Sequence, residues 1–98
     1  MEIIVEWDTK KAQVNLQKHK VGFEEAQTVF ADPFLVTFRD EFHSQSEDRF
    51  ISIGMSTRER VLLVVHTGSE ESSERITVRI ISCRKATSSE RKIYEENE

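Results

Sequence analysis

The clearest alternation of apolar and polar residues lies near the end of the chain. Within residues 75–86, the β-branched residues Ile76, Val78 and Ile80 occupy every second position. This period of two predicts a strand with two different faces, and it places Arg79 on the face opposite the apolar residues. A fixed positive charge in such a strand is costly unless its face meets water or binds an anion. The strand therefore raises the question of what Arg79 faces.

The same kind of pattern predicts the other elements. Further strands are expected at residues 2–6, 34–40, 49–55 and 61–66, and helices at residues 9–20, 23–31 and 88–96. The run at 61–65 is apolar on both faces, which is typical of a central strand. The segment at 68–74 is acidic, rich in serine and without apolar residues, which predicts a mobile hairpin tip.

Capping residues mark the predicted helix ends. Asp8 precedes the first helix and has a carboxylate that accepts the free N–H groups of a first turn. Gly22 is expected to end that helix, because glycine tolerates positive φ. Thr87 and Glu90 have the spacing of a capping box at the start of the last helix.

Short connections restrict the topology. The last four strands are too closely linked for parallel crossovers, so they should pair antiparallel. The two helices between the first and second strands must then cover one face of the sheet. We predict one α+β domain spanning residues 1–98, with a mostly antiparallel curved sheet, two N-terminal helices packed on one face and a C-terminal helix.

Strand parity sorts the basic residues of this sheet. Arg79 should point to the open face, away from the helices. The apolar residues of the strand at 49–55 should face the N-terminal helices, which sends Arg49 the same way. Arg84 falls on opposite parity to Arg79. Arg84 and Lys85 therefore need a strand end or a bulge if they are to meet Arg79 at one substrate.

Composition narrows the class of protein. The chain has 98 residues, one cysteine and a net charge of −4. One cysteine excludes an intrachain disulfide, and the acidic balance argues against a protein that coats nucleic acid non-specifically. No apolar run approaches membrane-spanning length, and the first residues lack the basic start of a signal peptide. We expect a cytoplasmic protein with no membrane contact, in which a local basic cleft remains compatible with the net charge.

Candidate chemistry comes from basic and proton-transferring side chains. The sequence has no phosphate-binding glycine loop, zinc-type Cys/His spacing or Gly-x-Ser-x-Gly motif, and we expect neither metal nor cofactor. The candidates are Lys18, His19, His43, Glu47, Arg49, His66, Arg79, Arg84, Lys85 and Tyr94. Structural explanations compete with function: a surface ion pair for Arg79, a salt bridge between Arg49 and Glu47, and a surface or capping role for His19 or His43.

Cleavage of RNA at its own 2′-hydroxyl requires a set of this kind. One group removes the hydroxyl proton, another protonates the leaving oxygen, and cations stabilise the extra negative charge on the phosphate. Histidine, glutamate or tyrosine can transfer protons, and arginine holds phosphate with a fork of donors. This chemistry needs no metal.

A combination of short motifs spans nearly the whole chain. It comprises Trp7-Asp8, Lys11-Ala12, Asn15, Lys18-His19, Val21-Gly22-Phe23-Glu24-Glu25-Ala26, Val29-Phe30, Asp32-Pro33, His43-Ser44, Glu47, Arg49, Ile53-Gly54, Val64-Val65, Arg79-Ile80-Ile81-Ser82-Cys83-Arg84-Lys85-Ala86-Thr87, Glu90-Arg91 and Tyr94-Glu95. Through this combination the chain resembles the BrnT family of toxins from bacterial type II toxin–antitoxin modules.

The resemblance implies a fold similar to that of RelE-type toxins and a ribonuclease that cuts RNA and stops translation. It also implies a cognate antitoxin that neutralises the toxin, with operator DNA bound only through the antitoxin. The implied catalytic set is His43, Glu47, Arg49, Arg79 and Arg84, and the implied RNA-binding set is Lys18, His19 and Lys85. In this set Arg79 and Arg84 stabilise phosphate, and His43 or Glu47 moves a proton.

The chain departs from the family pattern in two places. Residues 68–74 are longer and more acidic than the charged turn of relatives, which puts contact of this hairpin with RNA in doubt. Gly22 stands where relatives often have serine, which weakens the start of the second helix. Besides helping to bind RNA, Lys18 and His19 are suited to helix packing or to contact with an antitoxin.

Two other functions compete with RNA cleavage. One is an interaction module that has lost activity and only binds an antitoxin-like partner, which the acidic net charge favours. The other is direct DNA binding, which the lack of a helix-turn-helix with a basic recognition helix disfavours. Incubation of the purified protein with RNA separates the ribonuclease from the inactive interaction module.

Overall fold

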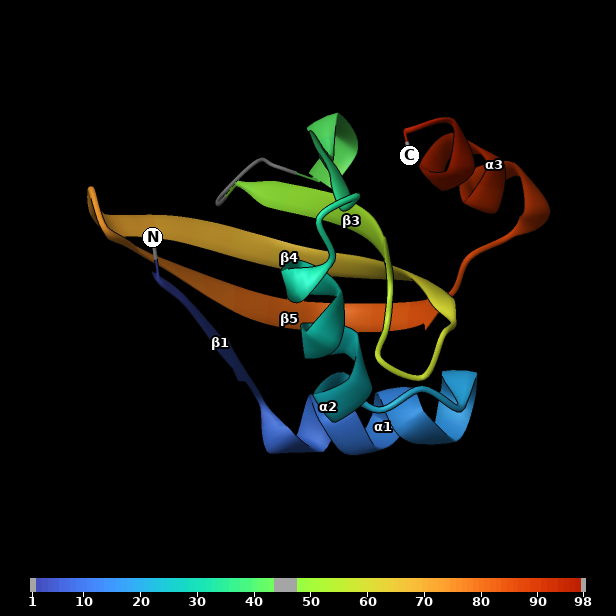
Figure 1. Cartoon of the computed structure of the whole chain (residues 1–98). Helices are drawn as coiled ribbons and strands as arrows, with labels where there is room; N and C mark the ends of the chain where they lie inside the picture. The colour runs from blue at the N-terminus through green and yellow to red at the C-terminus, as the bar shows by residue number, and fades with distance from the viewer. Residues whose placement is uncertain (1, 44–47, 98) are drawn as a thin grey trace.

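The computed structural model describes residues 2–43 and 48–97, apart from the side chains of residues 69–71. Within these residues, five strands form one mixed sheet in the order β1-β5-β4-β3-β2 (Figure 1). The elements are β1 (Glu2–Trp7), α1 (Thr9–His19), α2 (Phe23–Ala26), the 3₁₀ helix η1 (Gln27–Ala31), β2 (Val36–Arg39), the 3₁₀ helix η2 (Glu41–His43), β3 (Arg49–Met55), β4 (Val61–Ser72), β5 (Arg75–Lys85) and α3 (Ser88–Glu96). No described helix is both long and apolar enough to span a membrane.

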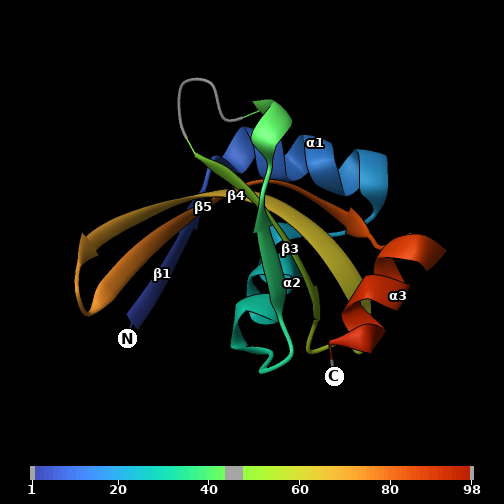
Figure 2. The same cartoon turned by 90° about the horizontal axis from the view of Figure 1, so that it is seen from above.

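Strand pairing agrees with the prediction for the last four strands. β2, β3, β4 and β5 pair antiparallel with their neighbours, as their short connections require. β1 pairs parallel with β5, which makes the sheet mixed. The sheet is strongly curved, and α3 lies at the opposite end from the β4–β5 hairpin tip (Figure 2).

The β4–β5 hairpin is longer than the sequence suggests. Residues 68–74 were expected to form a mobile tip, but the backbone pairing of β4 with β5 continues to Ser72 and Arg75. Backbone hydrogen bonds alone can continue an antiparallel ladder, so the lack of apolar side chains does not end it. The turn between β4 and β5 therefore consists of Ser73 and Glu74 alone, instead of the whole predicted tip.

A β-bulge in β5 changes which side chains share a face. Val65 pairs with Ser82, whereas the next residue, His66, pairs with Ile80, so Ile81 is the extra residue. A bulge of one residue inverts the alternation beyond it. Cys83 is therefore buried on the same side as Ile80, and the register puts Arg84 on the side of Arg79. The bulge that the parity argument required is present.

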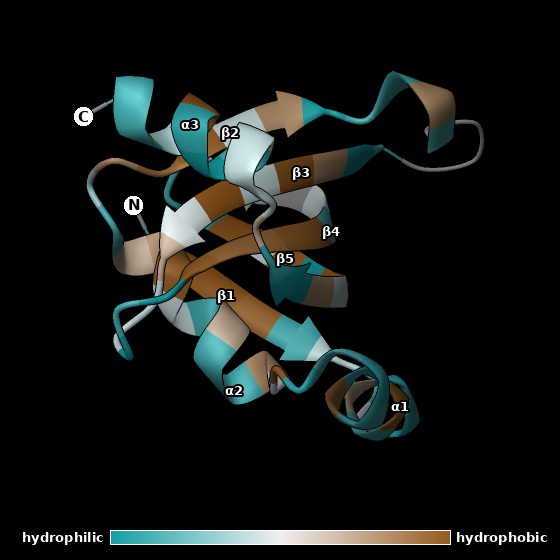
Figure 3. Cartoon of the chain, turned by 90° about the vertical axis from the view of Figure 1, so that its right-hand side faces the viewer, coloured by the Kyte–Doolittle hydropathy of each residue, from teal (hydrophilic) through white to brown (hydrophobic). Residues whose placement is uncertain are grey.

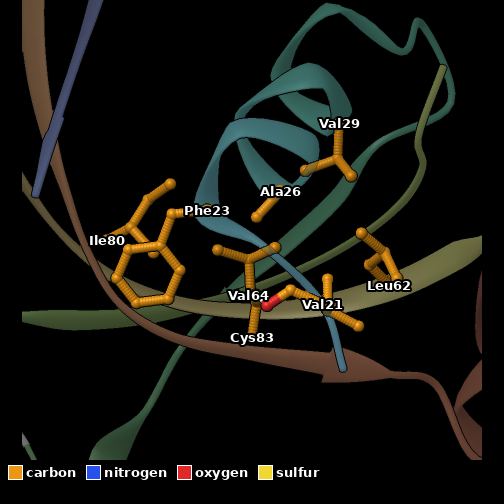
Figure 4. Packing of buried hydrophobic residues seen from close by; sticks show 8 residues of the cluster. All are labelled: Val21, Phe23, Ala26, Val29, Leu62, Val64, Ile80 and Cys83. Atoms are coloured by element: carbon orange, nitrogen blue, oxygen red, sulfur yellow. Dashed lines mark hydrogen bonds between the residues drawn. The ribbon is translucent and has the colours of Figure 1, made fainter. Parts of the chain in front are cut away.

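One face of the sheet is covered by α2 and η1, and we call it the α2 face. Its buried core consists of Val21, Phe23, Ala26, Val29, Leu62, Val64, Ile80 and Cys83 (Figure 4). Phe23 and Ala26 come from α2, and Val29 comes from η1. The predicted second helix is thus present, but it is a single α-helical turn continued by a 3₁₀ helix.

The opposite face carries α3, and we call it the α3 face. Its buried core contains Ile53, Val61, Leu63 and Tyr94, with Ile51 and Val65 packed beside them. The expectation that the apolar residues of β3 face the N-terminal helices is therefore wrong. Cross-strand partners project to the same side of a sheet, and Ile53 pairs with Leu63 rather than with the residues facing α2. β4 is apolar on both faces, as predicted for a central strand.

The first helix runs along an edge of the sheet. β1 stops pairing with β5 at Ile80, which leaves the later part of β5 without a strand on that side. The Asn15 amide of α1 takes the place of a strand there: its Oδ1 accepts from Cys83 N at 3.1 Å, and its Nδ2 donates to Cys83 O at 3.0 Å. α1 also packs Ala12 against the buried core of the α2 face, so it contacts the same side of the sheet as α2 while it runs along the edge of β5.

The predicted helix caps are present with one exception. The Asp8 carboxylate accepts from the backbone of Lys10 and Lys11 at the start of α1, and Thr87 and Glu90 form the capping box of α3. The positive φ after α1, however, belongs to Lys20 at 61° rather than to Gly22. Gly22 instead precedes α2 and has no side chain to cap it.

Candidate functional site

A row of residues crosses the α3 face from one edge of the sheet to the other. Arg49 of β3 pairs with Thr67 of β4, and Thr67 pairs with Arg79 of β5. Glu6 of β1 continues the row beyond Arg79. At the other edge, Asp40 donates its backbone N–H to Arg49 O at 2.8 Å. The Cα atoms of the two arginines are two strand spacings apart, about 9.5 Å, on the same face of the sheet.

Arg79 is exposed on this face. Most other arginines of the described chain are held in ion pairs: Arg39 with Asp48, Arg58 and Arg60 with Glu25, Arg75 with Glu2, and Arg84 with Glu90. Within that part of the chain Arg79 has no ion pair, although Glu6 is its neighbour in register. The surface ion pair that competed with an anion-binding role is therefore absent here.

Arg49 lies on the same face of the sheet as Arg79, contrary to the prediction for β3. It was expected to point with the apolar residues of β3 toward the N-terminal helices. Those residues in fact face α3, and Arg49 follows their alternation at the start of the strand, where it is half-buried. The structure thus brings together two arginines that strand parity had separated.

His43 lies at the β2 edge of the row, in η2. Its Nδ1 is 2.9 Å from Asp40 Oδ2, and its backbone N–H donates to Asp40 O at 3.3 Å. The Asp40 side chain is 12% exposed, whereas that of His43 is 64% exposed. The carboxylate favours the tautomer with hydrogen on Nδ1, which leaves the Nε2 lone pair able to accept a proton. Glu47, the other predicted proton carrier, lies outside the described residues.

Asp40 was missed by the sequence reasoning. Its spacing from His43 is the signal that was available, since residues three apart meet on one side of a helical turn. The pair combines an imidazole held by a carboxylate with a ring that is largely exposed. This is the arrangement that a general base needs.

Arg84 reaches the same face but is engaged by α3. Its two terminal nitrogens donate to the two Glu90 carboxylate oxygens at 2.7 and 2.9 Å. The hydrogen bond from Arg84 lowers the pKa of Glu90 to about 2, and the pair raises the pKa of the Arg84 guanidinium. Because Glu90 also belongs to the capping box, Arg84 anchors the start of α3 to β5. Its predicted contact with phosphate stays a prediction.

We expect the Arg84–Glu90 pair to stabilise the fold in a pH-dependent way. The pKa of Glu90 falls from its usual 4.5 to about 2 in the folded state, so folding favours the carboxylate. Its contribution should be complete above about pH 4.5 and lost as the pH falls toward 2. Urea unfolding of the wild type and Glu90→Gln should show a stability gap that closes over this range. A gap that stays constant would contradict this, and Glu95→Gln on an exposed position of α3 is the control.

An apolar pocket lies beside the row on the α3 face. Its volume is about 400 Å³, and it is lined by His19, Phe38, Ile51, Ile53, Leu63, Val65, Ser82, Cys83, Arg84, Glu90 and Ile93. His19 enters from the end of α1, and Phe38 is 41% exposed at the β2 side. An exposed aromatic ring over an apolar floor is a surface on which a nucleobase can stack.

The predicted RNA-binding residues fall in different places. Lys18 lines a groove between α1 and β5, next to the pocket that His19 lines. Lys85 pairs with Leu62 and therefore projects to the α2 face. The structure thus brings Lys18 and His19 near the α3 face and places Lys85 on the other side of the sheet.

Three other reactive side chains serve the core. His66 is 5% exposed on the α2 face, where its Nε2 lies 2.7 Å from Ser52 Oγ and burial lowers its pKa. Tyr94 donates its hydroxyl to Asp32 at 2.6 Å. Burial raises the pKa of the Cys83 thiol to about 11, so the thiol is protonated at neutral pH and is a poor nucleophile.

The fold and this face define a class of protein. A small mixed sheet that presents two arginines and an Asp–His pair on one face has the groups for cleaving RNA, which is the chemistry of ribonuclease toxins. A comparison with family models gives the family: residues 7–90 match the ribonuclease toxin, BrnT, of type II toxin–antitoxin systems. The chain belongs to this family.

A solved structure shows the same fold. The crystal structure of the Brucella abortus ribonuclease toxin BrnT superposes with a TM-score of 0.61 at 20% sequence identity, over 89% of this chain and 99% of that one. At this identity the likeness concerns the fold alone. No curated protein matches the sequence.

Proposed function

We propose that the protein is the toxin of a type II toxin–antitoxin module and acts as a metal-independent endoribonuclease. The observation that carries the proposal is the row on the α3 face, with Arg49 and Arg79 on one line and the Asp40–His43 pair at its edge. It supplies a proton acceptor and two cations around the space where a phosphodiester would lie. Cleavage of RNA in the cytoplasm would stop translation.

The proposed mechanism uses the RNA's own 2′-hydroxyl. His43 Nε2 removes the hydroxyl proton, and Asp40 stabilises the imidazolium that forms. The 2′-oxygen attacks phosphorus, the bond to the 5′-oxygen breaks, and that oxygen leaves with a proton. Arg49 and Arg79 stabilise the added negative charge on the phosphate. The products are a 2′,3′-cyclic phosphate and a 5′-hydroxyl, and Glu47 remains the predicted donor to the leaving oxygen.

Neutralisation by an antitoxin is part of the proposal. Exposed apolar side chains surround the site: Phe42 is 88%, Phe38 41% and Ile93 46% exposed. Phe42 precedes His43, and the other two line the apolar pocket. A partner that buries these side chains would also block the row. Operator DNA would be bound through that antitoxin, and the order of elements supports a relationship with RelE-type toxins.

A second candidate function is an inactive module that binds an antitoxin but cuts no RNA. The observation that favours it is the bidentate pair of Arg84 with Glu90, which engages one of the predicted phosphate ligands. The net charge of −4 adds to this, since it opposes RNA binding over most of the surface. The same experiment tests both functions.

We expect the purified, antitoxin-free protein to cleave RNA equally with and without a chelator, and to leave 2′,3′-cyclic phosphate ends. Gel analysis and end-group labelling measure both properties. Loss of cleavage on chelation would contradict the metal-independent mechanism, and 3′-hydroxyl ends would contradict attack by the 2′-oxygen. Absence of cleavage together with tight binding of the product of the neighbouring gene would establish the inactive module.

A further inference from the structure

The distribution of charge along the chain is uneven. Residues 9–20, which comprise α1 and Lys20, contain four of the 14 lysines and arginines and none of the 18 acidic residues. This segment carries four positive charges in a protein whose net charge is −4. The acidic residues lie elsewhere in the chain, and in Figure 3 α1 is largely hydrophilic while the central strands are apolar. α1 is therefore a cationic strip on an otherwise acidic protein.

The lysines of this strip line a groove. The groove has a volume of about 340 Å³ and lies between α1 and the bulge of β5, with the lining residues Lys10, Lys11, Val14, Asn15, Lys18, His19, Ile81 and Ser82. Lys11 and Lys18 are seven residues apart, which is two helical turns and about 10 Å along one side of the helix. Within the described chain neither Lys11 nor Lys18 forms an ion pair.

The groove is continuous with the candidate site. His19 and Ser82 line both the groove and the apolar pocket of the α3 face. Ile81, the bulged residue, is two positions from Arg79 in β5. The bulge thus connects the row on the α3 face with the edge where α1 lies.

We propose that the α1 groove binds backbone phosphates of the RNA beyond the cleaved bond. The RNA strand runs from the Arg49–Arg79 row past Ser82 and along α1, where Lys11 and Lys18 each contact a phosphate. Lysines on flexible stems without fixed partners hold phosphates as point charges, independently of base sequence. Continuity with the site favours RNA over an acidic protein segment. The proposal concerns the substrate of the proposed ribonuclease and so rests on that function.

The test measures the salt dependence of RNA binding. The probe is a fluorescent single-stranded RNA with 2′-O-methyl groups throughout, which cannot be cleaved through the 2′-oxygen. Its binding to the antitoxin-free protein is followed by fluorescence anisotropy. Lys11→Ala/Lys18→Ala should lower the slope of log K against log salt by about 1.4, since each phosphate contact contributes about 0.7. Arg91→Ala/Lys92→Ala removes the same charge from exposed positions of α3 and should leave the slope unchanged.

One further variant and one further probe sharpen the result. Lys11→Arg/Lys18→Arg keeps the charges and should keep the slope, and thermal melting checks that each variant is folded. A dinucleotide probe, which spans only the cleaved step, should bind all of these variants alike. An equal loss of slope in the α3 control would show a general charge effect and overturn the proposal. An unchanged slope in Lys11→Ala/Lys18→Ala would overturn it as well.

The outcomes separate this proposal from the proposed function. If the wild type cuts no RNA but Lys11→Ala/Lys18→Ala still lowers the salt slope of RNA binding, the α1 groove binds RNA and the proposed ribonuclease activity is contradicted. If the wild type cuts RNA and the slope is unchanged, the activity stands and the path fails. Loss of antitoxin binding with an unchanged RNA slope would make the groove a protein interface, which also overturns the path.

Discussion

Arg79→Ala is expected to reduce RNA cleavage by about 100-fold or more while the protein remains folded. Removing one preorganised donor from a developing negative charge typically costs about 10²- to 10³-fold in rate. Arg79 is exposed and has no ion pair in the described chain, so its loss leaves no buried group unsatisfied. Single-turnover cleavage rates and thermal melting measure the two effects separately.

The matched control for Arg79 is on the same strand. Arg75→Ala removes an exposed arginine of β5 that pairs with Glu2, far along the strand from the bulge. It should cleave RNA at nearly the wild-type rate. Arg79→Lys should recover only part of the rate, because the ammonium keeps the charge but lacks the planar fork that binds two phosphate oxygens. Equal rates for Arg79→Ala and Arg75→Ala would remove Arg79 from the site.

Local sequence signals predicted the elements and their caps well. The caps at Asp8 and Thr87 are set by residues a few positions apart, and both are present in the structure. The antiparallel order of the last four strands follows from short connections, and it is also correct. These features depend on chemistry within one turn or one connection, which a sequence displays directly.

The faces of the sheet were harder to predict, because they depend on distant contacts. Ile53 belongs to a core with Tyr94, whose helix begins at Ser88, 33 residues after β3 ends at Met55, so no local pattern reveals which helix covers it. The bulge at Ile81 is also hidden, since an isoleucine fits either side of a strand. These two features decide that Arg49, Arg79 and Arg84 share a face. Which side chains share a face therefore depends on contacts between residues far apart in the sequence.

Asn15→Ala is expected to lower the free energy of unfolding by about 3 kcal/mol, because it leaves several buried backbone groups without partners. Asn15 is 6% exposed, and its side chain accepts from Cys83 N while donating to Cys83 O and to Val21 O. The amide thus fills the place of a missing strand at the edge of β5 and holds the loop after α1. Urea unfolding measures the change, and Gln13→Ala on an exposed position of α1 should be nearly neutral.

Asn15→Asp separates hydrogen bonding from packing, because the two side chains have nearly the same shape. The carboxylate can still accept from Cys83 N, but it faces the Cys83 and Val21 carbonyl oxygens where the amide donated at 3.0 Å. Burial and these oxygens should raise the pKa of the new carboxyl in the folded state, so the variant should gain stability as the pH falls through that pKa. A variant as stable as wild type at neutral pH would show that the amide donors contribute little.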